Sequence, residues 1–154
     1  MSFKSILQAS VAATFLAGLP TQQSFAQANI VESLSQFNNG FITNNSRQSL
    51  SLKGVDQINT IQKGNKIILQ VVHDPLKAYE TLVTETLIKG GRVNGLNFQS
   101  TFTLGMVDQY CQNRIFDDMA YFGLKDQIQI DYKDQNGQLI KRHKVSKNLC
   151  SAGS

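Results

Sequence analysis

Residues 127–150 read QIQIDYKDQNGQLIKRHKVSKNLC and hold the clearest secondary-structure signal of the chain. Ile128, Ile130 and Tyr132 alternate with polar residues, which is the pattern of a β-strand with one face toward a core and one toward water. The dipeptide Asn136-Gly137 favours a tight turn into a second strand. The segment therefore predicts a β-hairpin with a cysteine just beyond it.

The start of the chain has the features of a secretory signal peptide. Lys4 is followed by a mostly apolar run at residues 6–19, and small residues ending at Ala26 or Ala28 offer a cleavage site. The apolar run is too short and too interrupted by polar residues to be expected to span a bilayer. We therefore expect residues 1–26 to be a signal peptide and the protein to be periplasmic or secreted, with no membrane span after signal removal.

The cysteines of the chain are Cys111 and Cys150. An even number of cysteines in an exported chain most simply means a disulfide. A nucleophilic or metal-binding thiol is the alternative, but no CxxC spacing, third thiol or His-Cys cluster supports it. The expected disulfide closes a loop of about 40 residues, which the chain-entropy model converts to roughly 4 kcal/mol of stabilisation.

Residues 27–154 are enough for one domain and too few for two. The chain has 15 Lys and Arg against 11 Asp and Glu, and of these only Lys4 lies in the signal segment. This mild positive charge is less than a nucleic-acid-binding surface needs, so nucleic acid is not an expected partner.

Two elements are expected between the signal segment and the middle of the chain. Apolar residues at steps of three and four predict a helix, and they are Ile30, Leu34, Phe37 and Phe41. The turn signal Lys63-Gly64-Asn65 separates a weaker strand at residues 56–62 from the apolar run 67–72. This pair predicts a second hairpin whose second strand is buried.

A helix is expected after this hairpin. Asp74 and Pro75 supply an N-cap and a first-turn proline, and Gly90-Gly91 ends the segment. Its apolar residues recur at helical spacing and are Leu76, Tyr79, Leu82, Val83 and Leu87. A strand over residues 81–88 is the alternative, because threonine and valine are frequent there.

Two further helices are expected between residue 100 and the last hairpin. Leu104, Val107 and Cys111 share one helical stripe, which predicts that Cys111 faces the core. Gly123 ends a short segment whose apolar residues are Ile115, Phe116, Met119 and Phe122. The elements together predict an α+β fold, with a small antiparallel sheet of about four strands, helices on one face and one closing disulfide.

No motif of a hydrolase, zinc site or nucleotide site is present in the sequence. His73 and His143 lie on different predicted strands, and a catalytic triad assembled from distant positions is the alternative that a single sequence leaves open. We expect a non-enzymatic protein without cofactor or metal.

The last strand carries the main concentration of charge, formed by Lys141, Arg142, His143, Lys144 and Lys147. Because side chains of a strand alternate between two faces, only two of the strand residues are expected to share a face. One interpretation is an edge strand whose lysines prevent pairing with other chains. The other is a binding patch for an anionic partner such as an acidic protein, a lipid headgroup or lipopolysaccharide.

The C-terminal third resembles small exported proteobacterial α/β proteins, among them the beta-type pilotins of type II secretion systems, which help an outer-membrane secretin to reach its place. The residues that carry the resemblance are Cys111, Arg114, Gly123, Tyr132, Asp134, Asn136-Gly137, Val145 and Cys150. The resemblance implies an α/β architecture and an accessory role. Pilotins are usually lipoproteins, whereas this chain has no cysteine near the expected cleavage site.

The first functional hypothesis is therefore an accessory or binding protein, of a secretion or envelope assembly, whose partner is another envelope or exported protein. The alternative is an inhibitor or immunity protein against a secreted enzyme or toxin, because a rigid disulfide-closed domain suits that role.

Overall fold

The computed structural model describes residues 22–45 and 53–151 of the chain. In chain order the elements are α2 (Gln22–Asn45), β1 (Val55–Lys63), β2 (Lys66–His73), α3 (Pro75–Ile88), α4 (Phe98–Gln112), α5 (Ile115–Tyr121), β3 (Gln127–Lys133), β4 (Leu139–Ser146) and α6 (Asn148–Ser151). Most of the expected signal peptide, residues 1–21, lies outside the described residues. The two expected cleavage points lie within α2.

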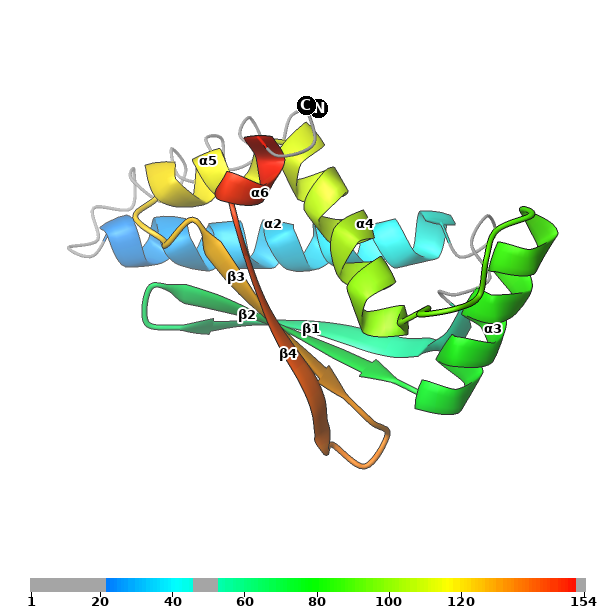
Figure 1. Cartoon of the computed structure of the whole chain (residues 1–154). Coiled ribbons are helices and arrows are strands. Elements are labelled where there is room, and N and C mark those ends of the chain that lie inside the picture. The colour runs from blue at the N-terminus through cyan, green and yellow to red at the C-terminus, as the bar shows by residue number, and fades with distance from the viewer. Residues whose placement is uncertain (1–21, 46–52, 152–154) are drawn as a thin grey trace.

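The four strands form one sheet in the order β1-β2-β3-β4. Each hairpin is antiparallel, whereas the central strands β2 and β3 are parallel, with Ile67 paired with Ile128 and Leu69 with Ile130. The α+β class, the four strands and the helices on one face are confirmed, but the expectation of an antiparallel sheet is wrong for this central pair. The helices between the hairpins return the chain to the end where β2 begins, so β3 runs beside β2 in the same direction (Figure 1).

The two faces of the sheet differ in composition. Along β2, the side chains of Ile67, Leu69 and Val71 are buried, whereas those of Ile68 and Gln70 between them are only partly buried. The same alternation on β3 buries the residues that its sequence pattern predicts, namely Ile128, Ile130 and Tyr132. Helices α2, α4 and α5 lie on the buried side (Figure 1), and the other face of the sheet is open.

Helix α2 packs along β1 and continues without a break through Asn38. Asn38 is fully buried, accepts a hydrogen bond from the Tyr110 hydroxyl at 2.7 Å and donates one to Thr60 Oγ1 at 3.0 Å. A buried amide with both groups bonded avoids the cost of an unpaired polar group. This residue therefore links α2, α4 and β1.

Helix α4 supplies the main layer over the sheet. Its largest buried side chains recur at four-residue steps and are Phe98, Phe102, Met106 and Tyr110, and Thr103 and Val107 beside them are also buried. The prediction that Leu104 belongs to the core-facing stripe is wrong, because Leu104 is 69% exposed. Phe98 and Phe102 lie in the first turns of α4. The helix face that they place toward the sheet differs from the one that carries Leu104.

A hydrogen-bonded network fastens α4 to strands β3 and β4. The hydroxyl of Tyr132 donates to the Gln99 carbonyl at 2.9 Å and lies 2.6 Å from Thr103 Oγ1. Thr103 Oγ1 also lies 2.7 Å from His143 Nδ1. Buried polar groups that satisfy one another in this way fix a single arrangement of helix on sheet.

The predicted disulfide between Cys111 and Cys150 is confirmed, with 5.3 Å between the Cα atoms. Cys111 lies near the end of α4 and is partly buried against the core, as its stripe predicted, while Cys150 lies in α6 directly after β4. The bond therefore ties the last strand to the central helix.

Candidate functional site

Helix α3 forms the first candidate surface, and its position is firmly set. The Asp74 carboxylate accepts a hydrogen bond from the Lys77 N–H at 3.1 Å, which confirms the predicted N-cap and the helix rather than the strand. Gly54 packs so tightly against Ala78 that a Cβ at position 54 would lie 2.5 Å from the Ala78 Cα. The side chain of Leu82 is buried beside this contact.

The apolar stripe of α3 points away from the domain. Leu76 is 65% exposed, Leu87 is 59% exposed, and Tyr79 lies between them with its ring half exposed. Steps of three, four and four residues place Leu76, Tyr79, Val83 and Leu87 on one helix face. Ile88, next to Leu87 in the sequence, adds another exposed side chain. We call the residues Leu76, Tyr79, Val83, Leu87 and Ile88 the α3 stripe.

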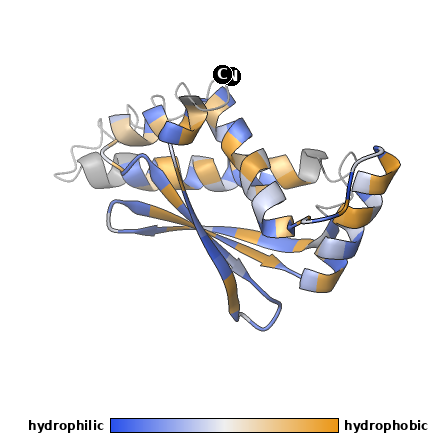
Figure 2. Cartoon of the chain, in the orientation of Figure 1, coloured by the Kyte–Doolittle hydropathy of each residue, from blue (hydrophilic) through white to orange (hydrophobic). Residues whose placement is uncertain are grey.

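The position of α3 explains why no other element that the structure describes covers its stripe. Figure 1 shows α3 beyond the end of β2, outside the layer formed by α2, α4 and α5, and Figure 2 shows hydrophobic residues recurring along it. Single exposed apolar side chains such as Leu104 are common on protein surfaces, whereas a row of them marks an interaction site.

The open face of the sheet forms the second candidate surface. Five basic residues were expected to gather near β4, and the structure divides them. Lys141 is paired with Tyr132 and His143 with Ile130, whose side chains face the helices. Arg142 and Lys144 alternate with them and line a hollow of about 530 Å³ on the open face.

Lys147 lies outside this hollow. Its ammonium forms an ion pair with Asp117 of α5, beside the disulfide. That hydrogen bond is the main reason why the pKa of Asp117 is lowered. Lys147, which lies between β4 and α6, therefore links this part of the chain to α5.

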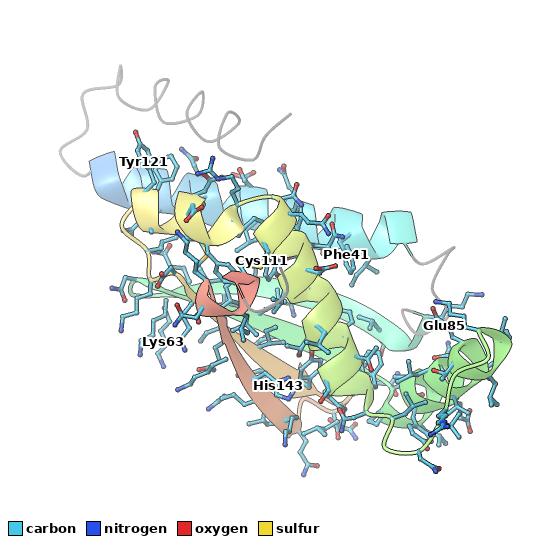
Figure 3. The ribbon with its side chains drawn as sticks, turned by 45° about the horizontal axis from the view of Figure 1, so that its top comes forward. Phe41, Lys63, Glu85, Cys111, Tyr121 and His143 are labelled. Carbon is cyan, nitrogen blue, oxygen red and sulfur yellow. A yellow bond between two sulfur atoms is a disulfide. The ribbon has the colours of Figure 1, made fainter. Side chains whose placement is uncertain are left out.

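Two basic residues that the sequence interpretation did not single out complete the hollow. Lys63 and Lys66 face each other across the β1–β2 turn, and both line the hollow with Arg142 and Lys144. Figure 3 labels Lys63 at this end of the hairpin. The turn itself was predicted, and Gly64 in it has φ of 64°. Only the parallel order of β2 and β3 brings these lysines near β4.

One carboxylate, Asp131, lies in the hollow and is already neutralised. Arg142 donates to it twice, from Nε at 2.7 Å and from Nη2 at 3.0 Å, and the Gln129 amide also donates to it at 3.1 Å. The hydrogen bond from Arg142 is the largest cause of the lowered pKa of Asp131. Within the described residues, Lys63, Lys66 and Lys144 form no ion pair, so the hollow keeps a net positive charge.

The two histidines lie on either side of Tyr132, with ring centroids 5.9 Å from it for His73 and 5.5 Å for His143. Gln99 Nε2 lies 3.1 Å from His73 Nε2, and burial lowers the pKa of both histidines. Neither histidine lines the hollow on the open face of the sheet. Their contacts are those of packing between α4 and the sheet.

Among residues 22–45 and 53–151, no group of three or more His, Cys, Asp or Glu side chains gathers as a metal ion would require. None of the described helices combines the length and apolar character needed to cross a membrane.

No family model matches this chain, and no curated protein sequence matches it. Among solved structures, the chain is similar to a pilotin. The matching structure is the pilotin EpsS from the type 2 secretion system of Vibrio vulnificus, with 13% identity and a TM-score of 0.41, over 80% of this chain and 96% of that chain. This is the class that the C-terminal third resembles, and a likeness of this degree does not extend to function.

Proposed function

We propose that the protein is a non-enzymatic accessory protein of the bacterial envelope that binds another exported or envelope protein through the α3 stripe. The observation that carries the proposal is the outward direction of this stripe on a helix that the domain holds in place. A row of exposed leucine, isoleucine and tyrosine side chains is stabilised when a partner removes it from water.

The geometry of the stripe favours an amphipathic segment as the partner. Leu76 and Leu87 are eleven residues apart in the sequence, which corresponds to about 16 Å along a helix axis. Anchors at steps of three and four are those that a second helix uses when it packs along the first. Lys77 and Glu80 are both exposed at one side of the stripe, so the partner should carry polar residues around its apolar row.

The fixed position of α3 supports binding without much ordering. The N-cap at Asp74, the tight contact between Gly54 and Ala78, and the ion pair between Glu85 and Lys89 at 2.9 Å already define the helix. A preformed surface loses little conformational entropy when a partner binds. The expected signal peptide would place this surface outside the cytoplasm, where an exported partner meets it.

The test is photo-crosslinking in cells of the native host. A photo-reactive amino acid is placed at Leu76 or Leu87 on the α3 stripe, and at Leu104 on α4 as the matched control, because Leu104 is as exposed as the other two. We expect one discrete adduct from both stripe positions, with an exported or envelope protein, and none from Leu104. An adduct with a second copy of this chain, with a cytoplasmic protein, or equally from Leu104 would overturn the proposal.

A further inference from the structure

We infer that the hollow on the open face of the sheet is a second binding site, for an acidic segment of an exported protein in extended conformation. This site is separate from the α3 stripe and does not depend on the function proposed for it. It is formed by Lys63, Lys66, Arg142 and Lys144 around the glutamine side chains of the central strands.

The arrangement of the strands places the cations on two opposite sides of β3. Lys63 and Lys66 come from the β1–β2 hairpin, whereas Arg142 and Lys144 come from β4, and β3 lies between these strands. Because neighbouring strands lie about 4.8 Å apart, β2 and β4 are separated by about 10 Å. An extended peptide lying over β3 fits between two basic walls at this separation.

The floor of the hollow combines glutamine side chains with Ile67 and Ile68, and the glutamines are able to bond a peptide backbone. Gln70, Gln127 and Gln129 line it, and Gln129 is paired with Ile68 on one side and Lys144 on the other. Side-chain amides both donate and accept hydrogen bonds, as a peptide backbone requires. Successive side chains of an extended chain point to opposite sides, so neighbouring carboxylates reach the two walls.

The charge of the hollow selects an anionic occupant. Four cations and one carboxylate line it, and that carboxylate, Asp131, accepts two hydrogen bonds from Arg142 and two from the Gln129 amide, at 3.1 and 3.3 Å. The three lysines are exposed and form no ion pair with any residue that the structure describes. They attract carboxylates that approach from solution, and salt weakens this attraction.

The shape of the site favours a peptide over a membrane surface. The lining side chains enclose a volume of about 530 Å³ on one face of a twisted sheet. An extended chain can enter such a recess and contact both walls and the floor together, whereas a flat layer of headgroups reaches only its rim. We therefore assign the site to a protein segment rather than to anionic lipid.

The test is binding of a fluorescein-labelled peptide with four consecutive glutamates, followed by fluorescence anisotropy in about 25 mM salt, where screening is weak. The comparison peptide carries glutamines at the same places. The variant is Lys63→Gln, Lys66→Gln, Lys144→Gln, and the matched control, which removes the same charge from exposed positions outside the hollow, is Lys53→Gln, Lys77→Gln, Arg92→Gln.

We expect the glutamate peptide to bind, the hollow variant to lose about tenfold or more in affinity, and the control variant to change by less than about twofold. Equal binding of the glutamine peptide, or equal losses in the two variants, would overturn the inference. Binding to vesicles of phosphatidylglycerol without binding to the peptide would also overturn it, because the ligand would then be a lipid headgroup.

Discussion

Helices α3 and α4 follow each other in the chain, have 14 and 15 residues, and begin with the same kind of side-chain cap, yet they use their apolar residues in opposite ways. Helix α4 buries Phe102 and Tyr110 in the core of the domain, whereas α3 leaves Leu76 and Leu87 exposed. The difference shows that an apolar helical face predicts a contact but not whether that contact lies within the domain.

The two helices are equally well anchored at their starts, so the exposure of the α3 stripe is not a sign of a loose helix. Asp74 caps α3 by accepting from the Lys77 N–H, and Asn97 caps α4 by accepting from the Ser100 N–H at 2.9 Å. The buried face of α4 stabilises the domain, and the exposed face of α3 is available for a partner.

The largest effect is expected from truncating one buried and one exposed side chain. Phe102→Ala should lower the free energy of unfolding by about 4 kcal/mol, because it removes a buried ring and leaves a cavity. Leu87→Ala on α3 should change it by less than about 0.5 kcal/mol. Urea denaturation followed by circular dichroism measures both, and comparable losses in the two variants would show that the α3 stripe packs within the domain.

Removal of the disulfide that joins α4 to α6 is expected to give the next largest loss of stability. Replacing Cys111 and Cys150 with alanine should lower the free energy of unfolding by about 3 kcal/mol, because the unfolded chain regains the freedom of the closed loop, and residual structure in that chain reduces the roughly 4 kcal/mol of the chain-entropy model. Urea denaturation measures this loss, and the wild-type protein in reducing buffer should show a similar one. An unchanged midpoint in both experiments would contradict the stabilising role of this bond.

The helix caps should each contribute about 1 kcal/mol. Asp74→Ala and Asn97→Ala each remove the acceptor for one N–H group of a helix start, so similar losses in thermal stability are expected. Differential scanning calorimetry of the two variants is the measurement. A loss at Asn97 with none at Asp74 would mean that α3 is not fixed by its cap, and would weaken the case for a preformed surface.

A smaller change in the free energy of unfolding is expected from pH, through the two histidines that pack between α4 and the sheet. Burial lowers the native pKa of His73 and His143 below the ordinary value of about 6.5, so below that pH the unfolded chain takes up protons that the native state does not. Stability should therefore fall as pH decreases from 7.5 to 5.5. Urea midpoints across this range should show a smaller slope for His73→Gln, His143→Gln, and an unchanged slope would contradict this origin.

At more acid pH a separate loss is expected from the open face. The pKa of Asp131 is lowered in the native state, chiefly by its hydrogen bond from Arg142, so its contribution is present near neutrality and disappears as pH falls through that lowered value. Asp131→Asn should remove this acid-range dependence in the same series of urea midpoints, while the histidine range stays as in the wild type. Retention of the acid-range loss in the variant would assign it to another carboxylate.

The local signals of the sequence were sufficient for most elements. Alternation at Ile128, Ile130 and Tyr132, the turn at Asn136-Gly137 and the cap at Asp74 are properties of neighbouring residues, and the structure confirms each. Gly137, for example, has φ of 83°, which favours glycine at this turn. The disulfide was predicted from the even number of cysteines and from the expected export of the chain.

Properties that depend on residues far apart could not be predicted in the same way. The parallel pairing of β2 with β3 depends on where three helices return the chain, and it brings Lys63 and Lys66 beside Lys144. The buried face of α4 was misjudged because the helix was expected only after residue 100, whereas it begins at Phe98. Helical spacing on α3 was visible, but its direction is decided by the contact of Gly54 with Ala78.

The most direct test of the central claim is the affinity of the crosslinked partner for three forms of the protein, measured by biolayer interferometry. These forms are the wild type, the stripe variant Leu76→Ser, Leu87→Ser, and the α4 control Leu104→Ser. We predict a loss of about tenfold or more for the stripe variant, because two apolar contacts are removed, and less than about twofold for the control. Equal affinity of all three folded forms would show that the exposed face of α3 is not the binding surface.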